Sequence, residues 1–200
     1  PFSVHRFPKD LYKTPETKAA FEDHLLRRFA SQIRKFSFQA KGSGKSGLLS
    51  VSSCGQEILS RTACEICTSK DSTLIFRFHI GFPANGRTIN ATELEKILFD
   101  FLPSCVERGC LYRTCDKKKL TETFVLAEDQ TFIRKEIHRL GLAAFVADGS
   151  ILPRQSGVSD LPMKDGVAFS SPESLRVTLH LPHRGSLSGM GIPRGITLIV

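Results

Sequence analysis

The sequence predicts an α+β fold, and three observations support this prediction. A long amphipathic helix is predicted over residues 15–38, because apolar side chains recur there at steps of three or four. A β-hairpin is predicted over residues 62–80, where apolar and polar side chains alternate. The order of elements up to residue 147 is α-β-β-β-α-α-α-β, so strands follow strands and helices follow helices, which is typical of an α+β domain.

The first helix has both a start signal and an apolar face. Thr14 suits the N-cap, Pro15 the first helical position and Glu16 the first turn. The apolar face consists of five side chains that must pack on another element, namely Phe21, Leu25, Phe29, Ile33 and Phe36. A glycine-rich loop over residues 41–47 then leads into a predicted strand over residues 47–52.

Capping and turn residues delimit the remaining elements. Asn90 caps a helix over residues 91–101, Pro103 kinks or restarts it, and Gly141 ends the last helix. The other predicted elements are strands over 62–67 and 74–80 joined by a turn at 69–72, helices over 105–112, 117–126 and 129–140, a strand over 142–147, a loop or linker over 153–165, a strand over 175–181, a turn over 182–185, and a turn that leads into a final apolar strand within 191–200.

Positive charge is concentrated near the N-terminus. The net charge is +8 with a pI near 9.4, and residues 1–46 carry ten Lys and Arg against four Asp and Glu. This concentration predicts a polyanionic partner, with nucleic acid ahead of a membrane surface or a nucleotide alone. No apolar run approaches the roughly 20 residues that a bilayer requires, so we expect no membrane partner.

Six cysteines in 200 residues are too few for a disulfide scaffold. We therefore expect a soluble intracellular protein, in the cytoplasm or in an organelle matrix such as the mitochondrial one. Cys64 and Cys67 form a C-x-x-C pair within a predicted strand, but no second pair completes a zinc site. We interpret both as small buried side chains and expect no metal site.

Six basic residues are the candidate nucleic-acid contacts: Arg27, Arg28, Arg34, Lys35, Lys41 and Lys45. The first four lie opposite the apolar face of the helix, and no acidic residue follows Asp23 on that helix, whereas an ordinary solvated face mixes both signs. The Gly/Ser loop can contact phosphate through backbone amides and its two lysines. A solvated helix face and a plain flexible linker are the alternative interpretations.

The segment Gly42-Ser-Gly-Lys-Ser46 is not a Walker A phosphate loop in its usual form. Gln39 stands where the first glycine of that motif belongs, and the segment leaves a helix and enters a strand, the reverse of the required order. No Ser-His-Asp, paired-carboxylate or Cys-His arrangement is evident, so we assign no catalytic residue.

Three motifs follow one another in the second half of the chain: Phe145-Val-Ala-Asp-Gly-Ser-Ile-Leu-Pro-Arg154, Ser171-Pro-Glu-Ser-Leu-Arg-Val-Thr178 and Gly189-Met-Gly-Ile-Pro-Arg-Gly-Ile-Thr-Leu-Ile-Val200. With these motifs, and with the Gly42–Gly47 loop after the basic helix, the chain resembles a family of predicted ATPases of the ABC class. The resemblance implies a family-specific N-terminal α+β domain over residues 1–166 and the beginning of an ABC-type nucleotide-binding domain over residues 167–200.

The resemblance also implies cofactors and a partner for the intact protein. These are ATP with Mg²⁺ and a second copy that dimerises through the ABC domain. In that family a Walker A loop follows the final strand at once, so this chain is expected to end just before it. Walker A, Walker B and the signature motif do not occur in these 200 residues, so we expect this piece to be inactive alone.

Five residues are candidate nucleotide contacts: Asp148, Gly149, Arg154, Phe169 and His180. The first three form a polar corner beyond a predicted strand end, where α/β folds place ligands. ABC domains stack an aromatic residue on adenine, and the candidates for this stacking residue are Phe169 and His180. The alternatives are an ordinary Asp-Gly turn, a surface arginine, and core packing of Phe169 and His180.

The leading hypothesis is an ABC-class ATPase that couples ATP binding and hydrolysis in the intact protein to a nucleic-acid ligand, with RNA favoured over DNA. The alternative is a non-enzymatic interaction or dimerisation domain whose basic helix docks on an acidic surface. A third hypothesis is a stand-alone phosphotransfer enzyme that uses residues 42–46.

Overall fold

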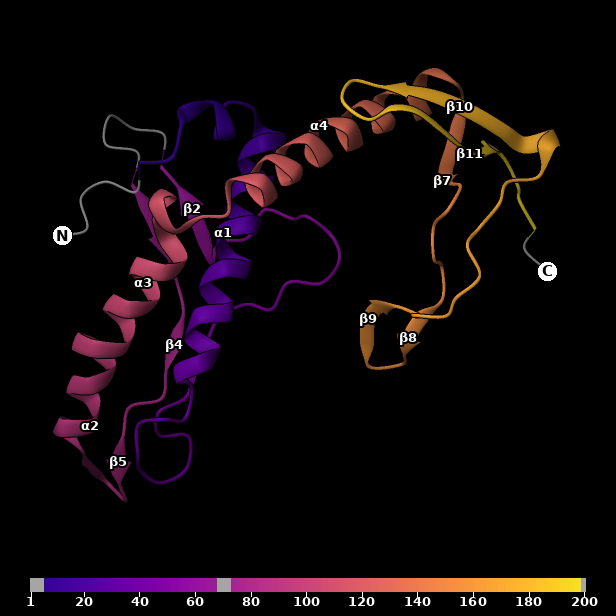
Figure 1. The fold of residues 1–200 in the computed structure, drawn as a ribbon. Coiled ribbons are helices and arrows are strands. Elements are labelled where there is room, and N and C mark those ends of the chain that lie inside the picture. Colours follow the sequence, from indigo (N-terminus) through magenta and orange to yellow (C-terminus); the bar gives the residue numbers. More distant parts are fainter. Residues whose placement is uncertain (1–5, 68–72, 199–200) are drawn as a thin grey trace. The chain divides into compact units, whose positions relative to one another are not determined.

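The computed structural model describes residues 6–67 and 73–198 (Figure 1). The chain divides between Phe124 and Val125 into two compact units, which we call the N-unit and the C-unit. The sequence predicts a division at 166/167. In the structure β7 (Leu142–Ala147) shares a sheet with β10 (Arg176–Leu181) and β11 (Gly185–Pro193), so residues on both sides of position 166 belong to one unit. The combination of helices and small sheets confirms the α+β prediction.

Helix α1 (Pro15–Phe36) begins where the sequence predicts. The Thr14 hydroxyl accepts a hydrogen bond from the Thr17 amide at 3.2 Å, and the Thr17 hydroxyl accepts one from the Thr14 amide at 3.1 Å. This reciprocal cap satisfies two backbone donors at the helix start. The helix ends two residues earlier than predicted, because Ser37 leaves the helical conformation while its amide still bonds to the Ile33 carbonyl.

The predicted apolar face of α1 forms the centre of the N-unit. Phe21, Leu25, Phe29 and Ile33 are at most 2% exposed. The N-terminal half of α1 packs on residues of β2 (Cys64–Ile66), and the C-terminal half packs on Leu49, Ile97 and Cys105. The fifth predicted residue, Phe36, is partly buried and stacks on Phe101 with the ring centroids 4.9 Å apart.

Short antiparallel strand pairs accompany α1. They are β1 (Leu49–Ser50) with β4 (His79–Ile80), β2 with β3 (Leu74–Phe76), and β5 (Ala84–Asn85) with β6 (Thr88–Ile89). The β2–β3 pair confirms the predicted hairpin, with Cys64 opposite Phe76. The strand predicted over 74–80 is divided between β3 and β4, which pair with different partners. The predicted turn at 69–72 lies outside the described residues.

A continuous helical stretch follows the strands. It consists of α2 (Ala91–Glu95), a π-helical segment (Lys96–Phe101) and α3 (Leu102–Cys110), and a short 3₁₀ turn (Tyr112–Thr114) succeeds it. The Asn90 side chain accepts a hydrogen bond from the Glu93 amide, as predicted. Pro103 stands in the first turn of α3, directly after the π-helical segment, and the helical stretch continues past it although proline has no amide to donate to the preceding turn. Within the N-unit, α3 lies beside α1 (Figure 1).

Two predicted helices form a single one. Helix α4 runs from Lys117 to Arg139 without a break, so the prediction of separate helices over 117–126 and 129–140 was wrong. The Asp116 carboxylate accepts hydrogen bonds from the Lys118 and Lys119 amides at 3.0 and 3.2 Å, which caps the helix start. Gly141 adopts a φ of +67°, which confirms the predicted left-handed residue after the helix.

The C-unit contains an antiparallel sheet in the order β10-β11-β7. The strands predicted at 142–147 and 175–181 are confirmed as β7 and β10, although β7 is only partly buried. Gly189 of β11 lies against β7, and a Cβ there would come within 2.4 Å of the Val146 carbonyl oxygen. A side chain at this position would therefore push the two strands apart.

Two expectations for the C-unit were wrong. The segment predicted as a loop over 153–165 contains the hairpin of β8 (Arg154–Ser156) and β9 (Ser159–Pro162), whose strands are too short and polar to show alternation. The predicted final strand is absent from its described part: β11 ends at Pro193, and residues 194–198 contain no strand. The described residues offer this segment no neighbouring strand with which to pair.

Candidate nucleic-acid interface

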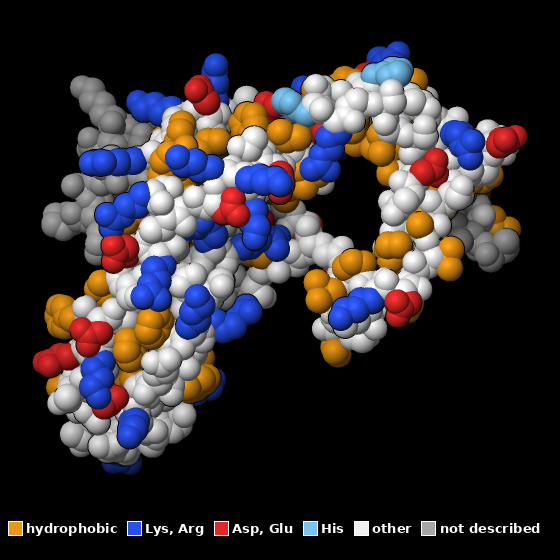
Figure 2. Space-filling view, in the orientation of Figure 1, with side chains coloured by type: hydrophobic (Ala, Val, Ile, Leu, Met, Phe, Trp, Pro, Cys, Tyr) orange, Lys and Arg blue, Asp and Glu red, His pale blue; other side chains and the backbone are white. Residues whose placement is uncertain are grey.

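The six predicted basic residues fall into three different settings. Arg28 and Lys35 lie on one stripe of α1, and Arg27 and Arg34 lie on another, because residues seven apart share a helical face. Lys41 and Lys45 belong to the loop that follows α1. Figure 2 shows Lys and Arg side chains distributed along the N-unit. The six residues therefore do not form one continuous row.

Arg28 has a structural environment. Its guanidinium donates hydrogen bonds to the carbonyl oxygens of Gly109, Arg108 and Thr114 at 3.0–3.1 Å. These carbonyls lie at and beyond the C-terminal end of α3, where backbone acceptors lack partners within the helix. Arg28 thus ties α1 to the end of α3, and few of its donors are left for a ligand. Lys35, on the same stripe, is exposed and bonds only to the Gln32 side chain within the described residues.

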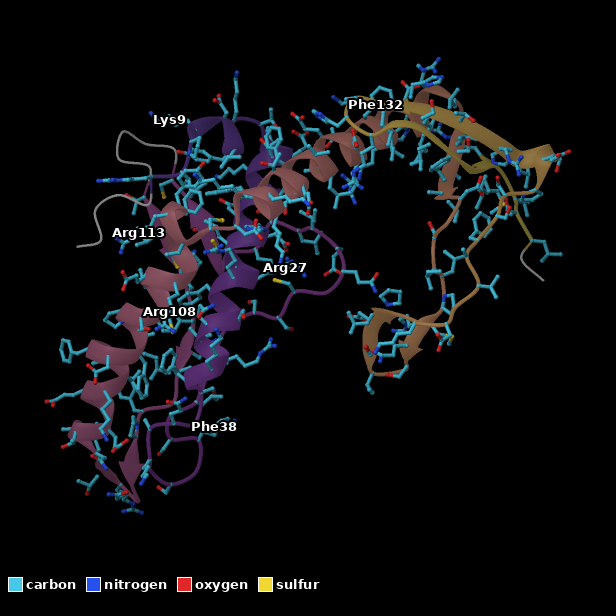
Figure 3. The ribbon with its side chains drawn as sticks, in the orientation of Figure 1. Lys9, Arg27, Phe38, Arg108, Arg113 and Phe132 are labelled. Atoms are coloured by element: carbon cyan, nitrogen blue, oxygen red, sulfur yellow. The ribbon has the colours of Figure 1, made fainter. Side chains whose placement is uncertain are left out.

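Arg27 is also engaged within the protein. Its Nε donates to the buried Asp23 carboxylate at 2.6 Å, and its Nη2 donates to the Glu57 carbonyl at 3.1 Å. Arg61 pairs with the other oxygen of Asp23 and with Glu57. The network fastens the coil segment 51–61 to α1, and Figure 3 shows Arg27 facing that segment. The positive charge of Arg27 is therefore already balanced by Asp23 within the protein.

Arg34 lies differently, at the edge of a groove of about 390 Å³ between α1 and residues 49–54. It is exposed and forms no hydrogen bond or ion pair within the part of the chain that the structure describes. Five serines line the groove: Ser31, Ser37, Ser50, Ser52 and Ser53. Ser37 accepts a hydrogen bond from the Leu49 amide, whereas the other four hydroxyls make none within the described residues. Hydroxyls and an unpaired guanidinium are groups that hydrogen-bond to phosphate oxygens.

The serines of this groove were not predicted as site residues. They stand apart in the sequence, two of them in a coil segment without periodicity, so only the packing of residues 49–54 against α1 brings them together. The i, i+7 spacing of Arg27 and Arg34 was the one available signal that pointed to this face.

The loop over 41–47 is an ordered structure and not a plain linker. The Ser46 hydroxyl is buried, accepts a hydrogen bond from the Ala84 amide at 3.1 Å and donates to the Ser43 carbonyl at 2.6 Å. The Ser43 amide donates to the Ala84 carbonyl, and the Gly47 amide donates to the Gly81 carbonyl, both at 2.8 Å.

These bonds matter for phosphate binding. The Ser43, Ser46 and Gly47 amides are all used within the protein, so the loop does not present the row of open amides that a phosphate loop offers. This geometry argues against phosphotransfer by residues 42–46. The Lys41 and Lys45 side chains are exposed, and neither forms an ion pair within the described residues.

In the C-unit, three of the five nucleotide-contact candidates come together. The Asp148 carboxylate accepts a hydrogen bond from the Ser171 hydroxyl at 3.0 Å, and it also accepts one from the Ser171 amide. Gly149 has a φ of +83°, and its amide donates to the Phe169 carbonyl at 2.8 Å. Asp148 and Gly149 therefore form a turn that fastens residues 169–171 to the end of β7.

The other two candidates lie elsewhere in the C-unit. Arg154 is exposed on β8 and pairs with Asp160 at 3.7 Å. His180 is exposed on β10, with its Nδ1 3.0 Å from the Ser186 hydroxyl. The Asp148 oxygens are thus already bonded to Ser171, and the described contacts do not bring all five candidates into one cluster.

The described residues contain no group of three or more His, Cys, Asp or Glu that could hold a metal ion. All six cysteines carry free thiols, and Cys64 lies in the apolar core. Burial raises the pKa of the Cys105 thiol to about 11 and that of the Cys110 thiol to about 12, which keeps both protonated and unreactive at neutral pH. Among the described residues, no helix combines the length and the apolar character needed to cross a bilayer.

Comparison with known proteins covers nearly the whole chain. Residues 1–113 match the family described as "ATPase of the ABC class N-terminal", and residues 116–200 match the one described as "P-loop domain". A search of curated proteins found no match. The second match defines the class, P-loop ATPases. The first match covers more than half of the chain, and the protein belongs to the ABC-class ATPase family.

Proposed function

We propose that this protein is an ABC-class ATPase whose N-unit binds nucleic acid, with RNA favoured over DNA, and couples that binding to the binding and hydrolysis of ATP in the intact protein. One observation carries the nucleic-acid part. Residues 24–56 contain six Lys and Arg and no Asp or Glu. Within that stretch the side chains of Arg34, Lys41 and Lys45 are exposed and form no ion pairs within the described residues.

We narrow the proposed contacts from six residues to three and treat Lys35, which lies on the other stripe of α1, as a secondary candidate. Arg27 and Arg28 are bonded within the N-unit, so their removal would disturb the fold as well as any ligand. We therefore assign phosphate contacts to Arg34, Lys41 and Lys45, with the groove serines as hydrogen-bond donors beside Arg34. Such contacts give salt-dependent affinity with little sequence preference.

ATP and Mg²⁺ are the cofactors that we propose for the intact protein, on the strength of its family membership. Walker A, Walker B and the signature motif do not occur in these 200 residues, so we place no catalytic step on any residue described above. Dimerisation through the ABC domain is part of the same proposal.

A salt series of oligonucleotide binding tests the nucleic-acid part. The dissociation constant of a single-stranded RNA and of the DNA of the same sequence would be measured between about 50 and 200 mM salt, a range in which phosphate contacts weaken strongly. Relative to the unsubstituted chain, the triple variant Arg34→Gln, Lys41→Gln, Lys45→Gln should bind more weakly. The slope of the logarithm of the binding constant against the logarithm of the salt concentration should become shallower by about 2, because each lost phosphate contact reduces that slope by about 0.7 for a single strand.

An unchanged slope in the triple variant would contradict the assignment. Absence of oligonucleotide binding at the lowest salt, together with capture of a partner protein that survives nuclease treatment, would favour the alternative of a basic helix docked on an acidic protein surface. Tighter binding of the DNA strand than of the RNA strand would reverse the ligand preference but leave the interface in place.

A further inference from the structure

Phe38 combines two features that rarely occur together. Its backbone has a φ of +63°, the left-handed region that side chains other than Gly, Asn and Asp seldom adopt. The residue is 62% exposed, although it lies only two positions after the last residue of α1 (Figure 3). A strained backbone that directs a large apolar ring into water gains nothing for the fold. This combination suggests that the ring has a use outside the fold.

The position of Phe38 is fixed by hydrogen bonds. Its amide donates to the Gly47 carbonyl at 2.7 Å, and the Gly47 amide donates to the Gly81 carbonyl at 2.8 Å. The first bond closes the loop over residues 38–47, and the second fastens that loop to the segment before β5. The ring of Phe38 is therefore presented from an ordered base.

Positive charge surrounds this ring along the chain. Lys41 and Lys45 lie within the loop that Phe38 closes, and Arg34 lies one helical turn before it. One acidic side chain contacts the loop within the described residues: the Glu93 carboxylate accepts a hydrogen bond from the Lys41 amide at 2.9 Å and pairs with Lys96 at 2.5 Å. Its charge is thus already shared with Lys96, and the loop exposes an aromatic ring and two ammonium groups beside the uncharged Gln39 and Ser43.

We propose that Phe38 stacks on a base of a single-stranded nucleic acid, while Lys41 and Lys45 contact the phosphates on either side of that nucleotide. This inference rests on the proposed nucleic-acid binding and adds the strandedness of the ligand and the residue that reads it. An aromatic ring beside lysines is the arrangement by which proteins hold unpaired bases, because every base has a π-face and its phosphates need cations. In a duplex the bases are already stacked on one another, so an exposed ring gains little from it.

The first test replaces Phe38 with glycine. Phe38→Gly removes the ring but keeps the left-handed backbone, which glycine adopts without strain. The variant should fold like the original chain by circular dichroism, and it should bind a single-stranded 12-nucleotide RNA on the order of 10-fold more weakly. The matched control is Phe99→Ala, which removes another exposed ring of the N-unit, 72% exposed, outside the basic loop and should leave the affinity unchanged.

The second test uses the absence of tryptophan from this sequence. Phe38→Trp introduces a single indole, whose fluorescence a stacked base quenches. Titration with the single-stranded RNA should quench it, whereas a strand of the same length without bases should bind through its phosphates and leave the emission nearly unchanged. A blunt duplex of the same sequence should also quench it little.

The outcomes separate this inference from the function on which it rests. Two results would overturn the stacking role and leave nucleic-acid binding intact. One is that Phe38→Gly binds the RNA as tightly as the original chain does, and the other is that the strand without bases binds the original chain as tightly as the RNA does. Equal quenching by duplex and single strand would likewise overturn it. Absence of any oligonucleotide binding by the original chain would overturn the proposed nucleic-acid binding and this inference together.

Discussion

His24 occupies a position on α1 where protonation is disfavoured. Its Nδ1 lies 3.2 Å from the Thr123 hydroxyl, and its Nε2 lies 3.8 Å from the Cys115 thiol. Burial, followed by the nearby positive charge of Arg28, lowers the pKa of the imidazole from 6.5 to about 4. At neutral pH this histidine is therefore an uncharged connection between α1 and the first turns of α4.

We expect the N-unit to lose stability as the pH falls from 7 to 5. The unfolded chain binds a proton at His24 near pH 6.5, whereas the folded chain does so only near pH 4, so acid favours the unfolded state in that window. The loss should reach about 1–2 kcal/mol at pH 5. Denaturant unfolding of the original chain and of His24→Gln at several pH values measures it.

The difference between these two proteins isolates His24, because Glu22 titrates in both. Burial raises the pKa of the Glu22 carboxyl, which opposes the effect of His24 by favouring the folded state in acid. An equal pH dependence in the original chain and in His24→Gln would show that His24 does not control acid stability.

At this scale the sequence predicts faces better than partners. Helical spacing places the four basic residues of α1 opposite its apolar face, and none of them is buried in the structure: Arg27, Arg28, Arg34 and Lys35. It gives no sign that Arg28 binds carbonyls around residue 109, some 80 positions away, or that Asp23 pairs with Arg61. A basic side chain on a helix can serve a ligand or a neighbouring carbonyl with the same chemistry, and only the tertiary fold decides which.

Helix α4 is continuous where the sequence predicts two helices. The sequence predicts a break near residues 127–128, yet the helix continues and Asp129 is only 2% exposed. One Asp129 oxygen accepts a hydrogen bond from the His183 amide at 3.1 Å. The other has no hydrogen-bond partner among the described residues and lies 3.9 Å from the Arg184 guanidinium. Asp129 therefore does not begin a second helix, as predicted, but lies within α4 and connects it to the turn between β10 and β11.

Substitutions of Asp129 should separate the hydrogen bond from the charge. Asp129→Ala leaves the His183 amide without its acceptor and should destabilise the C-unit by about 1–3 kcal/mol. Asp129→Asn keeps an acceptor oxygen and removes a buried charge, so it should cost less than about 1 kcal/mol. Chemical denaturation measures both. An equally large loss in both variants would instead mean that the attraction between Asp129 and Arg184 holds the turn, because both substitutions remove the carboxylate charge.

For the loop after α1, the sequence predicts the order of the elements but not the fixed conformation of the loop. Its order along the chain, helix then loop then strand, excluded a Walker A loop from the sequence alone. Its ordered state was not predictable, because Gly and Ser favour flexibility in isolation and the bonds that fix Ser43 and Ser46 come from residues 84–86. Phe38 escaped notice for a related reason: the sequence predicts it as the last residue of a helix, whereas its left-handed φ turns it outward.

Charge is divided unequally over the whole molecule. Residues 1–124 contain 20 Lys and Arg against 13 Asp and Glu, a net charge of +7, whereas residues 125–200 contain 8 against 7, a net charge of +1. The proposed phosphate contacts all lie in the N-unit. Polyanion binding should therefore depend on which unit loses positive charge, and not only on the number of charges removed.

Two variants with the same net charge test this dependence. The first neutralises Arg34, Lys41 and Lys45, and the second neutralises Lys135, Arg154 and Lys164, which are exposed residues of the C-unit. Each lowers the net charge from +8 to +5. If the N-unit holds the interface, only the first should give a shallower salt dependence, because counterion release follows the phosphates that are contacted and not the total charge. An equal decrease of the salt dependence in both variants would mean that the chain attracts polyanions through its overall electrostatic field. That result would contradict an interface on α1 and its loop.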